Sequence, residues 1–220
     1  MPQHRTRANK HSEEHIANGR TGDRARTSFF DEIAHEWDGM TGPDAEARIV
    51  EWCATLRLQP GAHVVDIGCG TGVSSLACAS QVRTGGRVLA IDRARNMLKA
   101  GKRRRPHPSI VWACADAHRL PVRDESADLL HALHVWPHID DQSEALRDWY
   151  RALRTGGRLT VVHLMSRETV NARHRGASRA VVKDILPPAE IVASSIREFG
   201  FTIDDVEDDD DHYLIRAVKL

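Results

Sequence analysis

The sequence predicts an α/β fold with a doubly wound, Rossmann-like sheet. Short apolar runs rich in β-branched residues alternate with segments of helical periodicity along most of the chain. The runs lie near 62–67, 87–92, 109–115, 127–133 and 157–163, and the helical segments near 72–80, 94–104 and 141–153. Such alternation is typical of parallel strands joined by helices that cover both faces of a sheet.

The C-terminal pattern is different. Pro187 and Pro188 begin a helix that we expect to run to about Phe199. Two further strands, one from Phe201 and one over 213–218, then flank an acidic turn. We therefore expect a mostly parallel seven-stranded sheet that ends in an antiparallel pair.

The N-terminal part precedes this pattern. Residues 1–27 contain almost no aliphatic side chains, so we expect a disordered or loose arm. Behind Ser28, a residue that favours helix N-termini, apolar side chains recur at helical spacing: Phe29, Phe30, Ile33 and Trp37. They predict a short amphipathic helix within 28–40, and a second helix is expected over 43–58.

The segment 63–72 carries the strongest functional signal. An apolar strand ends in an acid, Asp66, and three glycines follow at alternate positions. Glycine lets the backbone turn sharply and lets a ligand approach closely. A carboxylate just before the turn repels phosphate but can pair with an ammonium group. The spacing therefore favours a nucleoside that bears an ammonium over a dinucleotide, whose loop reads G-x-G-x-x-G.

Residues 65–72, Val-Asp-Ile-Gly-Cys-Gly-Thr-Gly, resemble the first motif of class I S-adenosylmethionine (SAM)-dependent methyltransferases, of the type 11 and ubiquinone-menaquinone methyltransferase kind. Further matches follow in register at 88–92, 96–98, 115–121, 128–130 and 153–159. The resemblance runs from about Phe29 to the C-terminus. It implies SAM as the methyl donor and S-adenosylhomocysteine as its product.

The resemblance also assigns cofactor contacts. Asp92 would hold the ribose hydroxyls, Met97 would pack on adenine, and Asp116 would accept from the adenine amino group. Asp66 and the glycines would shape the pocket for the amino-acid end. The expected cofactor set is Asp66, Gly68, Cys69, Gly70, Gly72, Asp92, Arg93, Met97, Asp116, Ala117 and His131.

Histidines are the candidate catalytic residues. Methyl transfer needs an acceptor atom aligned with the sulfonium methyl group, and a base where the acceptor carries a proton. Ligands of open α/β sheets lie beyond the carboxyl ends of the strands. His163 ends the fifth strand and is the stronger candidate base, and His138 follows the fourth. Ala132 and Leu133 stand where related enzymes often carry a polar pair.

Other side chains are expected to contact or cover the acceptor. Trp37 would close over the methyl donor, with core packing as its alternative. The polar segment 166–186, which contains His174, is a candidate substrate lid, with a solvated helix as the alternative. His134 is a further substrate candidate, with local hydrogen bonding as its alternative.

We expect no metal site in this chain. His131, His134 and His138 form a poor ligand set because Pro137 interrupts regular structure between them. The acidic run 204–211 lacks the spacing and the glycine of a calcium-binding loop, so it predicts a charged hairpin tip.

Composition bounds the remaining possibilities. The 220 residues are 41% hydrophobic, which suits one core, and we expect one domain over 28–220. Lys and Arg number 31, as do Asp and Glu, so no net field attracts nucleic acid. No apolar run approaches the about 18 residues of a membrane span, and the N-terminus lacks the apolar core of a signal peptide.

We expect a cytoplasmic monomer or homodimer, and the resemblance implies a small-molecule methyl acceptor. The cysteines form no C-x-x-C pair, so free thiols are expected at Cys53, Cys69, Cys78 and Cys114. Two alternatives stay open. One is a SAM-binding regulatory protein without turnover, suggested by Ala132 and Leu133, and the other is an RNA methyltransferase.

Overall fold

The computed structural model describes residues 23–41 and 43–220. It contains one seven-stranded sheet, whose strands are β1 His63–Ile67, β2 Arg87–Asp92, β3 Ile110–Cys114, β4 Ala127–Leu133, β5 Leu153–His163, β6 Phe201–Asp208 and β7 Tyr213–Lys219. The strand order is β3-β2-β1-β4-β5-β7-β6. β7 runs antiparallel to both β5 and β6, and the other neighbouring strands are parallel. The predicted mixed sheet with an antiparallel C-terminal pair is confirmed.

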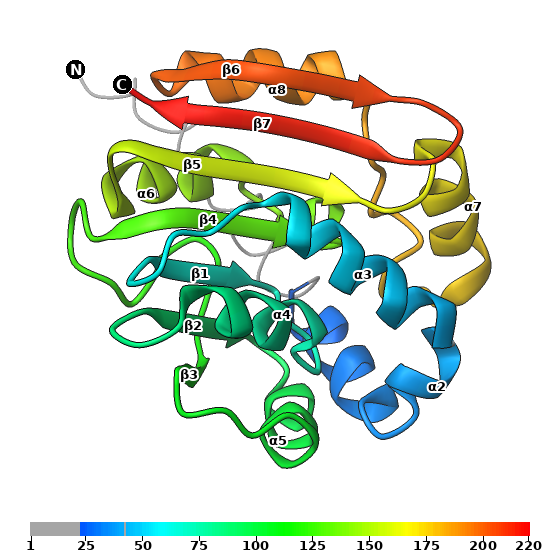
Figure 1. Ribbon diagram of the computed structural model, residues 1–220. Helices are drawn as coiled ribbons and strands as arrows, with labels where there is room; N and C mark the ends of the chain where they lie inside the picture. Colours follow the sequence, from blue (N-terminus) through cyan, green and yellow to red (C-terminus); the bar gives the residue numbers. More distant parts are fainter. Residues whose placement is uncertain (1–22, 42) are drawn as a thin grey trace, which may run out of the picture.

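Helices cover both faces of this sheet (Figure 1). Their bounds are α2 Trp37–Thr41, α3 Pro43–Thr55, α4 Val73–Val82, α5 Arg95–Arg104, the 3-10 helix η1 Trp136–His138, α6 Gln142–Ala152, α7 Arg167–Ala177 and α8 Ala189–Glu198. α3 and α4 lie on one face, and α6 and α8 lie on the other. α7 lies at the carboxyl end of β5. Within the described ranges, no helix is long and apolar enough to cross a membrane.

The N-terminal helix is already present at residue 23, before the position that the sequence predicts. Residues 23–33 form a helix, so the expectation of disorder is wrong for 23–27, and 1–22 lie outside the described residues. A turn at 34–36 separates this helix from α2, where the spacing predicts a single helix. The early start has a physical reason. Arg26 is only 8% exposed and forms ion pairs with Asp140 and Asp184, which hold this part of the helix against the rest of the protein.

Two apolar layers hold the sheet between its helices. Leu130 and Trp149 belong to the layer under α6 and α8, whereas Val64 and Cys78 belong to the layer under α3 and α4. β1 is buried from its second residue onward, because it lies at the centre of the sheet with helices on both sides. This burial fixes the end of β1, from which the glycine loop departs.

A network of ion pairs ties α2 and α3 to the glycine loop. Arg105 follows α5, is 7% exposed, and donates to Asp38 Oδ2 at 2.8 Å, to Glu46 Oε2 at 2.9 Å and to the carbonyl of Thr71 at 3.3 Å. The hydroxyl of Thr71 also donates to Asp38. Although burial opposes the shift, the bonds from Thr71 and Arg105 lower the pKa of Asp38. The network therefore holds α2 against the loop that follows β1.

We predict that Arg105→Ala lowers the free energy of unfolding by about 2–4 kcal/mol, because it removes the buried cation that joins Asp38 and Glu46. Urea denaturation followed by circular dichroism measures the change. Arg103→Ala is the matched control, because Arg103 is exposed on the last turn of α5, and it should change stability by less than about 0.5 kcal/mol. Equal losses in the two variants would contradict the anchoring role.

Candidate functional site

The glycine loop between β1 and α4 is a tight left-handed turn. Gly68, Gly70 and Gly72 have φ angles of 66°, 53° and 81°, which glycine adopts without strain. A Cβ atom at Gly68 or Gly72 would come within 2.4 or 2.2 Å of a neighbouring side chain. At Gly70 the nearest atom would be Nε1 of Trp37, at 3.7 Å. The loop can therefore be approached at Gly70, under the indole of Trp37.

Asp66 supports this loop from inside the protein. It is 1% exposed, and its Oδ2 accepts hydrogen bonds from the hydroxyls of Ser74 at 2.6 Å and Ser75 at 2.5 Å. The carboxylate thus holds the first turn of α4 beneath the glycines. The sequence predicts that Asp66 contacts an ammonium group of a ligand, whereas in the structure its side chain is enclosed by the protein. Burial raises the pKa of Cys69 well above its ordinary value, so its thiol stays protonated.

Asp92 holds the loop from the end of β2. Its Oδ2 accepts from the backbone amide of Gly70 at 2.9 Å, and its Oδ1 accepts from that of Ala94 at 2.8 Å. Burial raises the pKa of Asp92, although these bonds oppose the shift. Each carboxylate oxygen can accept more than one hydrogen bond, so Asp92 keeps capacity for a hydroxyl group. Beside it, Arg93 pairs with Asp23 of the helix 23–33 at 2.5 Å.

Asp116 lies after β3, where the motif order places it. Its Oδ1 accepts from Nδ1 of His118 at 2.6 Å and from the His118 amide at 3.0 Å. These interactions lower the pKa of Asp116 to about 2, so it is a carboxylate at neutral pH. The Asp116 side chain is 42% exposed, which leaves it accessible to a ligand. The carbonyl of the adjacent Ala117 accepts from Trp149 Nε1 at 2.8 Å, which ties this turn to α6.

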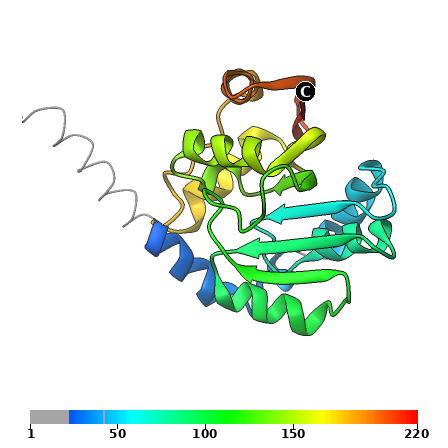
Figure 2. The same ribbon diagram turned by 90° about the vertical axis from the view of Figure 1, so that its left-hand side faces the viewer.

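Aromatic side chains cover the loop. The ring of Phe30 meets that of Trp37 edge to face at a centroid distance of 5.8 Å, and meets that of His138 at 5.2 Å. Met97 is buried beneath Phe30 and Trp37. Figure 2 shows the helix 23–33 across the carboxyl ends of the central strands. A continuous set of contacts therefore leads from the glycine loop to the histidines that follow β4.

His131 does not belong to this space. It is completely buried in β4, and its Nδ1 lies 2.7 Å from the hydroxyl of Thr160. The ring adjoins the thiol of Cys53, whose pKa is lowered to about 6 by Cys78 and His131 against the effect of burial. The side chain of His131 is therefore enclosed in the core, apart from the contacts that cover the glycine loop, and its cofactor contact stays a prediction.

His134 and His163 form a pair beside the ends of β4 and β5, in which His163 is buried and His134 is half-buried. Their Nδ1 atoms are 3.4 Å apart, and burial lowers the pKa of His134 to about 3 and that of His163 well below its ordinary value. Both rings are therefore neutral at physiological pH. Two buried polar atoms here have no hydrogen-bond partner in the described chain, namely Nε2 of His163 and the hydroxyl of Tyr213.

The segment 166–186 returns to the site at its end. It contains α7, and Asp184 beyond this helix accepts from Nδ1 of His138 at 2.7 Å. His174 of α7 donates through Nδ1 to the Asp184 carbonyl at 2.5 Å, and its ring lies 4.9 Å from that of His138. Arg26 pairs with the same carboxylate.

Sequence reasoning missed Asp184 and Arg26. Each is a single charged residue in a polar segment, where neither spacing nor periodicity distinguishes it from a solvated side chain. Their joint burial beside His138 is visible only after the chain has folded. The only indication in the sequence is the polar segment 166–186, which predicts a lid. It does not show that Asp184 is the residue of this segment that faces His138.

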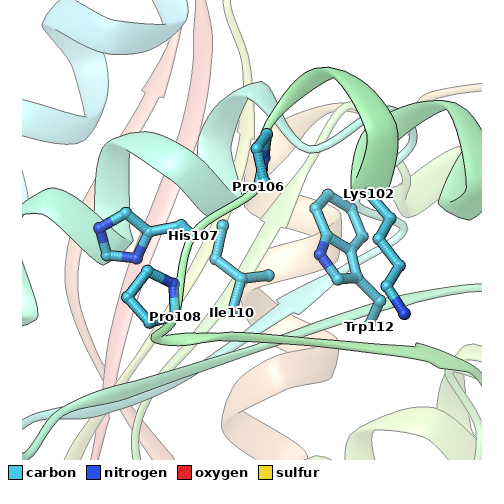
Figure 3. Close-up of a pocket in the computed structure, with 6 residues that line it drawn as sticks. All are labelled: Lys102, Pro106, His107, Pro108, Ile110 and Trp112. Atoms are coloured by element: carbon cyan, nitrogen blue, oxygen red, sulfur yellow. The ribbon is translucent and has the colours of Figure 1, made fainter.

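Two further features lie apart from this site. Among the described residues, ligand atoms within 4.8 Å of one another occur in Glu207, Asp209 and His212, at the β6–β7 turn. A hollow of about 370 Å³ opens at the β3 edge of the sheet (Figure 3), and it is lined by Lys102, Pro106, His107, Pro108, Ile110 and Trp112. None of the residues lining the hollow is in the expected cofactor or acceptor set.

Comparisons with known proteins agree with the geometry. A family profile described as a methyltransferase domain matches residues 65–161. The demethylmenaquinone methyltransferase of Lysinibacillus sphaericus is 26% identical over 185 residues, which cover 81% of this chain and 78% of that protein. An uncharacterized 37.1 kDa protein in a transposon of Streptomyces fradiae is 36% identical over 107 residues, which are 48% of this chain and 31% of that protein. This chain thus matches less than a third of the length of the Streptomyces relative.

Solved structures show the same fold. A SAM-dependent methyltransferase from Aquifex aeolicus superposes with a TM-score of 0.68 at 14% identity, over 85% of this chain and 98% of that one. Together with the sequence matches, this likeness supports a class I SAM-dependent methyltransferase domain, with SAM as its cofactor.

We predict that Gly70→Ala weakens SAM binding at least about tenfold, because a methyl group there enters the approach under Trp37. Isothermal titration calorimetry with SAM measures the dissociation constant, and circular dichroism checks that the variant is folded. Gly39→Ala is the matched control, since its added Cβ would meet nothing within 4 Å. A folded Gly70→Ala protein with unchanged affinity would move the cofactor away from this loop.

We also predict that His134 and His163 weaken the fold in acid. Below pH about 6.5 the unfolded chain binds protons at these imidazoles, whereas the folded chain does not until a much lower pH. The free energy of unfolding therefore falls as the pH is lowered, by up to about 1.4 kcal/mol per pH unit for each histidine.

The double variant His134→Asn, His163→Gln tests this linkage. Its free energy of unfolding should fall less steeply than that of the wild type between about pH 7 and pH 5. His118, whose pKa is raised, is present in both proteins, so its contribution cancels in the difference. Identical slopes would mean that the two imidazoles are accessible to protons in the folded state.

Proposed function

We propose that this class I SAM-dependent methyltransferase transfers the methyl group to a small-molecule acceptor bound under the helix 23–33. One observation carries the proposal. The uncrowded backbone at Gly70 lies next to Trp37, and ring contacts lead from Trp37 through Phe30 to His138. A donor at the loop and an acceptor at the histidine would then be neighbours, as alignment for displacement requires. The acceptor in the name of the Lysinibacillus relative is also a small molecule, which supports this class.

The cofactor would lie across the ends of β1, β2 and β3. Asp92 would accept from its ribose hydroxyls, Met97 would line the adenine side, and Asp116 would accept from the adenine amino group. Asp66 would act indirectly, by holding the glycine loop through Ser74 and Ser75. When bound, SAM supplies an electrophilic methyl group to the acceptor.

His138 is the better candidate base of the two histidines that the sequence singles out. Its side chain is 15% exposed, and its Nδ1 is engaged with a carboxylate, which leaves Nε2 to take a proton. His163 is enclosed, and its pKa is far below neutrality, so it holds a proton poorly. The unpartnered Nε2 of His163 and hydroxyl of Tyr213 would instead receive a hydroxyl or carbonyl group of an acceptor that enters beside the partly exposed His134.

The acceptor class follows from these surroundings. The rings of Phe30, Trp37, His138 and His174 offer aromatic contacts, and the neutral imidazoles of His134 and His163 offer hydrogen bonds without charge. A neutral aromatic acceptor with an ionisable hydroxyl group fits both features. We further propose a cytoplasmic monomer or homodimer that does not act on nucleic acid.

Isotope-labelled SAM tests the proposal. The full chain is incubated with demethylmenaquinol, catechol, a simple thiol and a short RNA, and labelled product and S-adenosylhomocysteine are quantified. We expect turnover with a hydroxyaromatic compound. SAM binding without product from any acceptor would favour the regulatory protein without turnover, and labelled RNA would favour the RNA methyltransferase.

We predict that His138→Ala lowers kcat for the hydroxyaromatic acceptor by roughly 10²–10⁴-fold, because loss of a general base acts on the transition state. His163→Ala should act chiefly on KM, because it removes a contact made with the bound acceptor. His35→Ala is the control, since this histidine is exposed and its ring contacts Glu32 and Glu36 instead of His138. A kcat that stays near the wild-type value in His138→Ala would mean that positioning alone drives transfer.

A further inference from the structure

We propose that Asp184 is a positioning residue for His138 and that Arg26 holds the two in place. The inference rests on the proposed methyl transfer and deepens it, because it names the groups that prepare the base. The three residues come from distant parts of the chain: Arg26 from the helix 23–33, His138 from η1, and Asp184 from the segment after α7.

The first step is the tautomer of His138. Asp184 Oδ2 lies 2.7 Å from His138 Nδ1, and an ionised carboxylate can only accept a hydrogen bond. Nδ1 must therefore carry the hydrogen in the neutral ring, and Nε2 keeps the lone pair that a base needs. This is the arrangement by which an oriented carboxylate prepares a histidine in hydrolytic triads.

The second step is the charge of Asp184. The residue is 7% exposed, and a buried carboxylate without a cation is strongly disfavoured. Arg26 Nε lies 3.0 Å from the same oxygen, and its guanidinium also donates to the His138 carbonyl at 2.9 Å. Arg26 thus contacts both members of the pair. Although burial opposes it, the neighbouring Asp140 and Asp184 raise the pKa of Arg26, so the cation persists.

The third step is the orientation of the ring. His138 meets Phe30 at 5.2 Å and His174 at 4.9 Å between ring centroids. His174 also donates to the Asp184 carbonyl, so the same helix that contacts the ring fixes the backbone of its partner. The base is therefore complete only when the helix 23–33 and the segment 166–186 are both packed against η1.

Ring-nitrogen NMR on the full-length protein tests the arrangement without knowledge of the acceptor. ¹⁵N shifts of His138 above neutral pH distinguish the two tautomers, with His138→Gln to assign the signals. We expect hydrogen on Nδ1 in the wild type. In Asp184→Asn a neutral amide oxygen accepts more weakly than a carboxylate and the amide nitrogen can donate, so the share of the Nε2–H tautomer should rise. Asp210→Asn, at an exposed position, should leave the tautomer unchanged.

Two results would overturn the proposal. One is a wild-type His138 with its hydrogen on Nε2, which needs no variant and so does not depend on the folding of one. The other is an Asp184→Asn protein with an unchanged tautomer. Calorimetry with SAM should show less than a threefold change in affinity in Asp184→Asn, since the residue does not touch the glycine loop.

Turnover separates this inference from the proposed function. With demethylmenaquinol or catechol, Asp184→Asn should lower kcat at least tenfold and change KM less than threefold. Asp184→Glu, which keeps the carboxylate, should recover part of the loss. If the wild type turns over and Asp184→Asn matches it in kcat, the positioning role is wrong. If the wild type transfers no methyl group while the tautomers behave as expected, the proposed reaction fails and the pairing stands.

Discussion

The hydrogen bond from the backbone amide of Gly70 to the carboxylate of Asp92 is the constraint on which the site depends. It fixes the glycine loop to the end of β2, while Asp66 fixes the same loop to the start of α4 through two serine hydroxyls. Two acids, the buried Asp66 and the half-buried Asp92, thus hold a turn that only glycine adopts easily. The indole of Trp37 is then placed over this turn, and the histidine-rich ends of β4 and β5 lie beyond Phe30.

Much of this arrangement could be predicted from local patterns. The five parallel strands follow from apolar runs of β-branched residues, and the loop follows from alternate glycines after Asp66. The ends of the strands and helices could be predicted less well from the sequence. β5 begins at Leu153 instead of 157, because Leu153 pairs with Ala127 before an irregularity in the ladder. α3 ends at Thr55, and Arg57 then takes a left-handed conformation with φ of 47°.

The features that the sequence could not predict depend on contacts between charged residues that are far apart in the chain. Arg26 helps to order a helix in a segment whose composition predicts disorder, because its partners Asp140 and Asp184 lie more than a hundred residues away. The side of the sheet on which a strand residue lies is a related difficulty. His131 lies in the core beside Cys53, whereas His134, three residues later, pairs with His163. Burial decides which imidazole can meet a ligand, and one-dimensional spacing does not report it.

The backbone of His134 adopts an unfavourable conformation, and this affects how the protein could be stabilised. Its φ of 57° lies in the left-handed region, which disfavours a non-glycine residue by roughly 1–2 kcal/mol. Glycine would adopt this conformation without strain, so the fold keeps a side chain here at a cost in backbone energy. At such strained positions, a substitution that raises thermal stability can lower activity. A programme that selected only for heat resistance would tend to replace His134 and so remove a half-buried imidazole from the proposed acceptor pocket.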